Sequence, residues 1–281
     1  MARRAWRTRQ KNGPGLLFIL VALVVVAAAG ARYVGLYAPE QPTLAPQWRA
    51  VKTEEEPPPT EEEVSRRTQE PVTVLVLHAH TSENYSPSPS HDKNGKGEIV
   101  TVGAEFCQAI SEKGIKAINL KASFDAPKYS DAFKNAGEAV AKALAENPNI
   151  KAVIDIHRDG LPVQKDKDYT AAVAAGQRVA KILFVVGDVS NPNSSSNMAF
   201  AEAVKSRLDA MFAGVSRGIK VQHRNVNGNL HPNTLCAYIG DYNGNTLAEA
   251  RASARLLADA VAGVLLAQAQ EGMSVLPTTT P

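Results

Sequence analysis

The chain has few cysteines and little net charge, and each of these features excludes some classes of function. It contains 281 residues, which allow one large domain plus appendages, and only two cysteines, Cys107 and Cys236. Neither cysteine belongs to a Cys-x-x-Cys pair, so we do not expect them to bind a metal; they either form one disulfide or remain buried free thiols. The formal net charge is only +3, which does not indicate a nucleic-acid partner. A Gly-rich phosphate loop and internal repeats are also absent from the sequence.

The N-terminus combines a basic flank with a long apolar run. Residues 1–14 contain five basic side chains: Arg3, Arg4, Arg7, Arg9 and Lys11. An uncharged stretch follows over residues 15–31, and its apolar character continues to residue 37. A membrane span needs about 20 residues, so we predict a single-pass signal-anchor over residues 15–37 behind a cytoplasmic tail. The small residues 27–31 leave a cleaved signal peptide as the alternative. Both interpretations place the following domain on the extracytoplasmic side of the cell membrane.

Residues 38–70 are predicted to be a linker. They contain Pro57-Pro58-Pro59 and two runs of glutamates, Glu54-Glu55-Glu56 and Glu61-Glu62-Glu63. Proline and repelling charges favour an extended chain, at roughly 3 Å per residue. The folded domain is then expected over residues 71–271, with a loose tail at residues 272–281.

From residue 72 onward, strand-like and helix-like segments alternate. Strands are expected at residues 72–77, 115–120, 151–156, 178–186 and 234–239, and helices at residues 102–113, 130–146, 197–212 and 246–270. Such alternation predicts an α/β fold with a mostly parallel sheet flanked by helices.

Two of these strands lead into histidines. Residues 72–77 run into His78, with Glu83 five residues further along, and residues 150–156 run into His157. Ligands collect at the carboxyl ends of strands in parallel sheets. Two histidines and one carboxylate are the ligand set of a catalytic zinc with an open fourth position.

Other polar residues near these strands receive supporting roles. We expect His80 to lie beside the metal ligands rather than among them, because Thr81-Ser82 indicates that the strand has already ended. Asp155 and Asp159 flank His157 and can orient an imidazole by accepting its second N–H.

Taken together, the motifs resemble the stage II sporulation protein P family. The family pattern of a strand followed by His-Thr-His-Thr-Ser-Glu-Ser-Tyr is matched by His78-Ala-His-Thr-Ser-Glu-Asn-Tyr85. Its Ile-Asp-Ile-His-Arg-Asp and Phe-Val-Val-Gly are matched at residues 154–159 and 184–187. Its closing Gly-x-x-x-Asn-Thr-Leu-Glu-Glu-Ala is similar to residues 240–250. The family also has one N-terminal anchor and a spacer, so the likeness covers nearly the whole chain.

This resemblance implies a zinc-dependent peptidoglycan hydrolase with a fold similar to N-acetylmuramoyl-L-alanine amidases. Such enzymes cut the amide between the glycan and the stem peptide, and the family is also credited with cleaving peptide cross-links. It further implies work with a lytic transglycosylase and a membrane scaffold during engulfment of the forespore. Carried over by position, the zinc ligands would be His78, Glu83 and His157.

One departure from the family pattern bears on activity. Family members usually read Leu-Ile-Glu-Val-Gly-Gly in the last strand, and that glutamate resembles a general base. The matching stretch here is Cys236-Ala-Tyr-Ile-Gly-Asp241, which puts Tyr238 in its place. A phenol with a pKa near ~10 is a poor base at neutral pH. Either another carboxylate, for which Asp241 is the candidate, serves as base, or the chain is an impaired peptidoglycan-binding scaffold subunit. A different exported zinc amidase or carboxypeptidase fits the ligands but explains the closing motif less well.

Overall fold

The computed structural model describes residues 71–163, 166 and 168–274, which belong to one compact unit. The predicted basic tail, anchor and linker lie outside these residues. In the described part, six strands form one sheet in the order β2-β1-β3-β8-β6-β7, and β4 and β5 form a separate pair. All neighbours in the large sheet are parallel except β6 and β8. The predicted α/β class with a mostly parallel sheet is confirmed.

The predicted helices and strands occur in the predicted order, and two further strands, at Ala171–Ala174 and Ser216–Gln222, occur beside them. The strands are β1 (Thr73–Leu77), β2 (Lys116–Asn119), β3 (Ile150–Asp159), β4 (Ala171–Ala174), β5 (Gln177–Ala180), β6 (Ile182–Gly187), β7 (Ser216–Gln222) and β8 (Thr234–Asp241). The helices are α3 (Ile99–Ser111), α4 (Ala132–Glu146), α5 (Ser194–Met211) and α6 (Leu247–Ser274), with short 3-10 turns at Tyr129–Asp131 and Gly228–Leu230.

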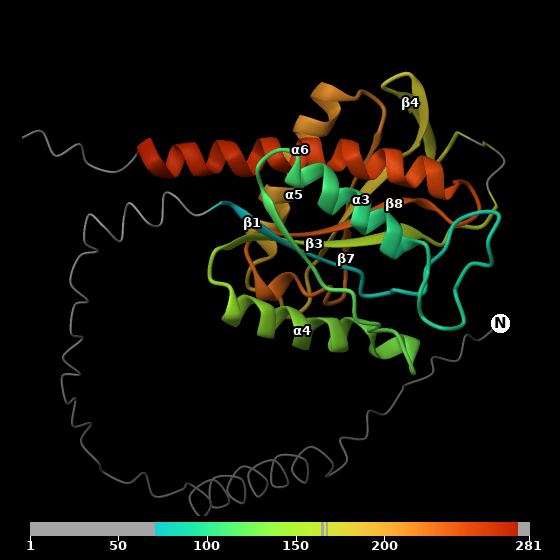
Figure 1. Ribbon diagram of the computed structural model, residues 1–281, viewed down its shortest axis with the longest axis horizontal. Helices are drawn as coiled ribbons and strands as arrows, with labels where there is room; N and C mark the ends of the chain where they lie inside the picture. Colours follow the sequence, from blue (N-terminus) through green and yellow to red (C-terminus); the bar gives the residue numbers. More distant parts are fainter. Residues whose placement is uncertain (1–70, 164–165, 167, 275–281) are drawn as a thin grey trace, which may run out of the picture. The chain divides into compact units, whose positions relative to one another are not determined.

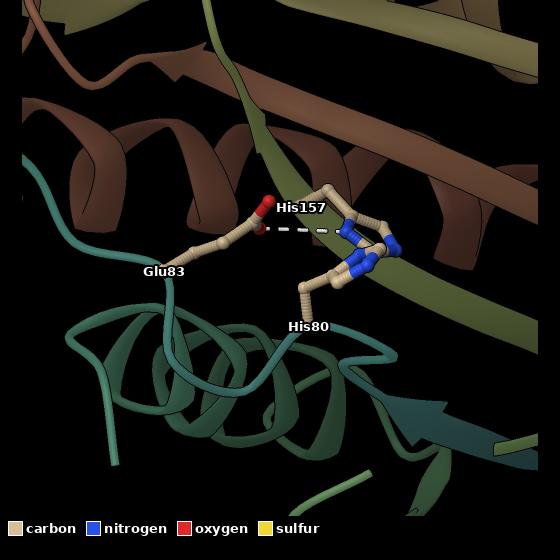
Figure 2. A group of neighbouring side chains, drawn as sticks. All are labelled: His80, Glu83 and His157. Carbon is tan, nitrogen blue, oxygen red and sulfur yellow. Dashed lines mark ion pairs between the residues drawn. The ribbon is translucent and has the colours of Figure 1, made fainter. Parts of the chain in front are cut away.

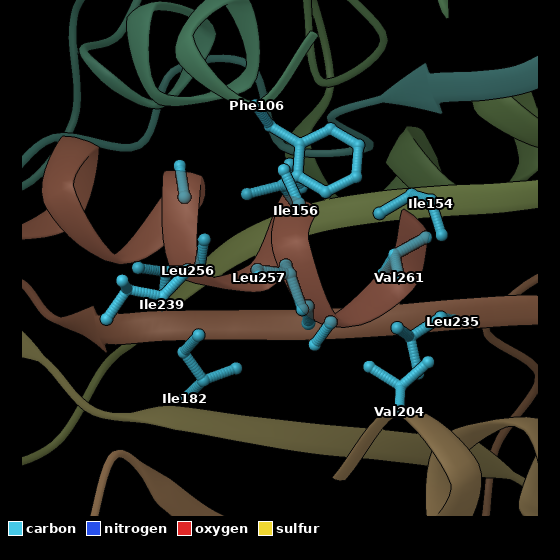
Figure 3. Packing of buried hydrophobic residues seen from close by; sticks show 14 of the residues in the cluster. Phe106, Ile154, Ile156, Ile182, Val204, Leu235, Ile239, Leu256, Leu257 and Val261 are labelled. Carbon is cyan, nitrogen blue, oxygen red and sulfur yellow. The ribbon is translucent and has the colours of Figure 1, made fainter. Parts of the chain in front are cut away.

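Helices cover the two faces of the sheet unequally. Figure 1 shows α3, α5 and α6 on one side and α4 alone on the other. On the first side, Ile154 and Ile156 of β3 pack with Phe106 and Leu257 in the main core (Figure 3). Alternate residues of β3, such as Val153, face α4 in a smaller cluster. Because side chains alternate along a strand, odd-numbered positions of β3 lie on the α4 face.

Helix α6 is the longest helix of the described chain. Residues 247–271 are long and apolar enough to cross a membrane, and 56% of that segment's most apolar window is buried inside the domain. Its residues Leu257 and Val261 are fully buried in the main core. We therefore assign α6 as a core helix, whose apolar surface faces the sheet and α3 rather than lipid.

Two details of the sheet differ from the sequence prediction. The strand expected over residues 178–186 is divided at Lys181: β5 turns back onto β4, and β6 enters the large sheet. The β4–β5 turn at Ala175 and Gly176 has positive φ at both residues, as tight hairpins require. Strand β7 was not predicted, because its sequence is polar and lacks a buried face.

Both cysteines are free within the described residues. Cys236 is buried in β8 and Cys107 is partly buried in α3. Burial raises the pKa of both thiols, to about 11 for Cys107, so the reactive thiolate is disfavoured at neutral pH. Of the two alternatives for these residues, the structure has the free thiols.

Candidate metal centre

Three potential metal ligands converge where β1 and β3 end. His80 and Glu83 lie on the loop after β1, and His157 lies near the end of β3 (Figure 2). One ligand atom from each residue lies within 4.8 Å of the other two. We call His80, Glu83 and His157 the His–Glu–His group.

His157 is held between two carboxylates. Its Nδ1 lies 3.4 Å from Glu83 Oε2, and its Nε2 lies 3.0 Å from Asp155 Oδ1, off the line of an ideal N–H bond. Burial alone would lower the pKa of His157, but Asp155 and Glu83 raise it to about 10. Because Asp155 lies beside Nε2, the other ring nitrogen, Nδ1 on the Glu83 side, is the one that could bind a metal ion.

The loop that carries Glu83 is fixed by buried hydrogen bonds. The Asp125 carboxylate accepts hydrogen bonds from the hydroxyls of Thr81 and Ser82, at 2.7 and 2.6 Å. It also accepts a 3.0 Å hydrogen bond from the Ser82 backbone amide. Glu83 Oε2 accepts the Arg158 amide at 3.1 Å, and the Arg158 guanidinium lies 3.5 Å from Glu83 Oε1. Burial alone would raise the pKa of Glu83, but His157 and Arg158 lower it, so this carboxyl is ionised.

His80 completes the group from the more open side. Its ring stacks on Tyr129 at 4.2 Å and meets the His157 ring edge-on at 5.3 Å, measured between centroids. Burial and the charge of His157 lower the pKa of His80 to about 4. His80 is therefore neutral at physiological pH, which is the form that binds a metal.

The structure does not bring His78 into the group, contrary to the ligand set implied by the resemblance. His78 follows Val74 and Val76 on the α3 and α6 face, where its Nδ1 lies 3.0 Å from the Ile156 carbonyl. A Cβ added at Gly103 of α3 would lie 2.1 Å from His78 Nε2, so the helix closes over this ring. His157 lies on the opposite face of the sheet. The chain turns after β1 ends, and that turn directs His80 toward His157 instead.

Asp241, the candidate general base, is also kept from the group. Its Oδ1 accepts the Leu161 amide at 2.8 Å, and its Oδ2 accepts the amides of Asn243 and Gly244 at 3.1 and 3.0 Å. Burial raises the pKa of Asp241, although the hydrogen bonds from these three amides act to lower it. Asp241 thus holds the turn between β8 and α6.

A cavity of about 340 Å³ opens beside the His–Glu–His group. Its lining residues are His80, Glu83, Tyr129, Ser130, Phe133, Arg158, Gly160, Arg224 and Tyr238. Among these, only Glu83 carries a carboxylate. Tyr238 pairs with His157 in the β3–β8 register, with ring centroids 5.4 Å apart, and burial raises the pKa of its phenol. Tyr238, at the position where the family resemblance implies a base, therefore contributes a neutral phenol to the cavity wall.

A second possible ligand cluster shares His157. Asp155, His157 and Cys236 also bring one ligand atom each within 4.8 Å of the others. All three are buried, and none except His157 belongs to the first group. The raised pKa of Cys236 disfavours the thiolate that a metal requires. The His–Glu–His group is the better candidate, because two of its members line an open cavity.

Sequence reasoning missed several cavity residues, among them Arg224 and Phe133. Arg224 donates to the Tyr238 hydroxyl at 3.0 Å and lies over the Phe133 ring, 5.0 Å from its centroid. Phe133 also stacks against His157 at 5.7 Å. Phe133 lies in α4 and Arg224 in the loop after β7, so no local pattern links them to the histidines.

Comparison with known proteins found a similar sequence and several similar solved structures. One relative, "Stage II sporulation protein P" of Bacillus subtilis (strain 168), is 30% identical over 158 residues. That match covers 52% of this chain and 38% of the relative's own length. Similar solved structures include the N-acetylmuramoyl-L-alanine amidase AmiC2 of Nostoc punctiforme, with TM-score 0.45, 17% identity, and coverage of 71% of this chain and 97% of that chain. The CwlD amidase of Clostridioides difficile in complex with the GerS lipoprotein has TM-score 0.45, 12% identity, and coverage of 71% and 98%.

The sequence model of one family matches most of the chain. That model is described as "Stage II sporulation protein P (SpoIIP)", and it matches residues 39–262. The match contains every member of the His–Glu–His group and the whole large sheet. The chain therefore belongs to the stage II sporulation protein P family.

Proposed function

We propose that the chain is a membrane-anchored, zinc-dependent peptidoglycan hydrolase of sporulation. The His–Glu–His group beside an open cavity carries this proposal, and the family supports the link to sporulation. The proposed bond is the amide between the glycan and the stem peptide, with peptide cross-links as additional substrates. The proposed partners are a lytic transglycosylase and a membrane scaffold of the engulfment machinery, met on the extracytoplasmic side of the membrane.

The residues present fit zinc. Two imidazoles and one carboxylate match the donors of catalytic zinc sites. One geometric observation supports this fit: Asp155 faces the remote nitrogen of His157, which leaves the other ring nitrogen on the Glu83 side. Bound zinc would polarise a carbonyl and lower the pKa of water to about 7. His80 replaces His78 in the ligand set that we propose.

The remaining cavity residues would position the substrate. Tyr129 and Phe133 offer aromatic surfaces at the cavity, and Ser130 lies between them in sequence. Arg224 presents a cation, held in place by the Tyr238 hydroxyl. A carbonyl oxygen that gains negative charge during hydrolysis is stabilised by such a fixed cation.

The first experiment incubates the full chain with peptidoglycan, with and without zinc, and identifies released fragments by mass spectrometry. We expect zinc-dependent release of free stem peptides. His157→Ala should abolish zinc binding and release together, whereas His223→Ala, at a histidine whose side chain is 89% exposed, should change neither. Retained release by His157→Ala would remove this residue from the ligand set.

A specific observation favours a second candidate, a peptidoglycan-binding scaffold subunit. Glu83 is the only carboxylate among the described residues that line the cavity, and as a metal ligand it cannot also act as a free base. A folded protein that holds zinc and binds the wall, yet releases nothing, would establish this candidate instead.

A further inference from the structure

A larger cavity lies next to the His–Glu–His cavity. Its volume is about 510 Å³, and Tyr238 lines both cavities. Its other lining residues are Asp159, Leu161, Asp166, Tyr169, Lys181, Leu183, Ser216, Arg217, Lys220 and Gln222. We call it the cationic cavity, because basic side chains outnumber carboxylates among these residues.

The cationic cavity exists because α4 covers only part of its face of the sheet. Leu183 of β6 pairs with Tyr238 of β8, and Lys220 of β7 pairs with Val185 of β6. Partners in register point to the same face, and Val185, Leu183 and Tyr238 form a small cluster on the α4 side. Helix α4 packs with β1 on this face. The β6–β7 edge therefore keeps an open surface, with an apolar floor of Leu183 and Tyr238.

Cations outnumber carboxylates around this floor. Lys181, Arg217 and Lys220 line the cavity together with Asp159 and Asp166. The Arg217 guanidinium pairs with Asp159 at 3.0 Å. That pair leaves two lysines against one carboxylate.

The two lysines are held differently. Lys181 Nζ donates a 2.9 Å hydrogen bond to the backbone carbonyl of Asp168. This bond keeps the ammonium in place without neutralising its charge. The Lys220 side chain is exposed, and its ammonium makes no ion pair or hydrogen bond with the described residues. A cavity of this size with an unpaired ammonium is suited to a carboxylate on a flexible ligand.

We infer that the cationic cavity binds the carboxylate-bearing stem peptide of the substrate, while the glycan extends from the other side of the His–Glu–His cavity. This inference rests on the proposed function, since it assigns the orientation of the same substrate. The glycan has few charges, whereas stem peptides carry carboxylates. Tyr238 lines both cavities. When the amide between glycan and stem peptide is positioned at the His–Glu–His group, the stem peptide can therefore extend past Tyr238 into the cationic cavity.

The test is a binding measurement that needs no hydrolysis. The probe is a synthetic stem tetrapeptide, L-Ala-D-Glu-meso-diaminopimelate-D-Ala, titrated into the zinc-free full chain by calorimetry. A second peptide has its carboxylates amidated. Lys220→Gln removes the unpaired charge, Lys220→Glu reverses it, and Lys142→Gln is the control on α4, where the side chain is 76% exposed.

We expect Lys220→Gln to weaken binding of the acidic peptide about threefold and Lys220→Glu about tenfold, with weaker effects at high salt. The amidated peptide should bind less tightly and respond to neither substitution, and Lys142→Gln should match the unaltered chain. Equal affinity for both peptides, or no response to Lys220→Glu, would overturn the inference. Charge-dependent binding without any zinc-dependent hydrolysis would support the cavity assignment and reject only the proposed function.

Discussion

The hydroxyl of Tyr238 accepts a 3.0 Å hydrogen bond from Nη2 of Arg224, and the same ring faces His157 across the β3–β8 pair. This arrangement puts a phenol and a cation on the cavity wall at the position where the family resemblance predicts a glutamate. Burial raises the pKa of the phenol, so Tyr238 stays protonated throughout the physiological range.

The first prediction concerns Tyr238→Glu. A carboxylate at this position would face the cavity beside Arg224 and could accept a proton, so we expect release from peptidoglycan to rise about tenfold or more. The measurement is the initial rate of stem-peptide release at neutral pH. Tyr238→Phe keeps the ring without the hydroxyl and should leave the rate within about threefold, a limit set by the loss of one hydrogen bond. A loss of release in Tyr238→Glu would instead show that the phenol has its own role.

The second prediction separates His80 from His78. His80→Ala should remove stoichiometric zinc, because His80 belongs to the His–Glu–His group. His78→Ala should keep zinc but reduce the free energy of unfolding by about 2 kcal/mol, because it empties a fully buried site under α3. Zinc content by mass spectrometry and unfolding in urea give the two readouts. Zinc lost from His78→Ala in a protein that remains folded would restore His78 to the ligand set.

The third prediction concerns Asp155. Asp155→Asn retains an oxygen for the Ala79 amide, which Asp155 Oδ1 accepts at 3.0 Å. It removes the negative charge beside His157 Nε2, so His157 becomes less basic and less firmly oriented. We expect zinc affinity to fall about 10- to 100-fold while the zinc-free protein stays folded. Competition with a fluorescent chelator measures the affinity, and unchanged affinity would assign Asp155 a purely structural role.

The fourth prediction concerns pH and the contact between α3 and α6. Hydrogen bonds from Arg251 and Arg255 lower the pKa of Glu105 below its usual value. A lowered folded-state pKa contributes stability that is present above the unfolded value and lost as the pH falls through the folded value. Glu105→Gln should therefore lower the free energy of unfolding by about 1 kcal/mol at pH 7, and the difference should vanish in acid.

Urea unfolding at several pH values tests this dependence. Glu112→Gln is the matched control, because Glu112 pairs with Arg255 through a side chain that is 45% exposed and screened by solvent. We expect the control to change stability less than Glu105→Gln at pH 7. A difference for Glu105→Gln that persists unchanged in acid would contradict the assigned ion pairing.

The sequence alone determined the class of the fold and the neighbourhood of the site. Apolar runs such as residues 72–77 and 151–156 are long enough to be recognised as buried strands, and their order implies a parallel sheet. Glu83 and His157 follow such strands, so their meeting at one edge of the sheet was predictable. Strand β7 was not, because an edge strand has one free side and needs no continuous apolar pattern.

Only the tertiary structure decided which histidine joins the group and what surrounds it. His78 and His80 are two residues apart, and alternation alone would point both to the same face. The turn after Leu77, held by Asp125 from a distant loop, breaks that rule. The Asp241 carboxylate likewise has its orientation set by three backbone amides that no local pattern reveals. Strand periodicity is a local property that short-range forces encode, whereas the direction of a loop side chain depends on contacts between residues far apart in the chain.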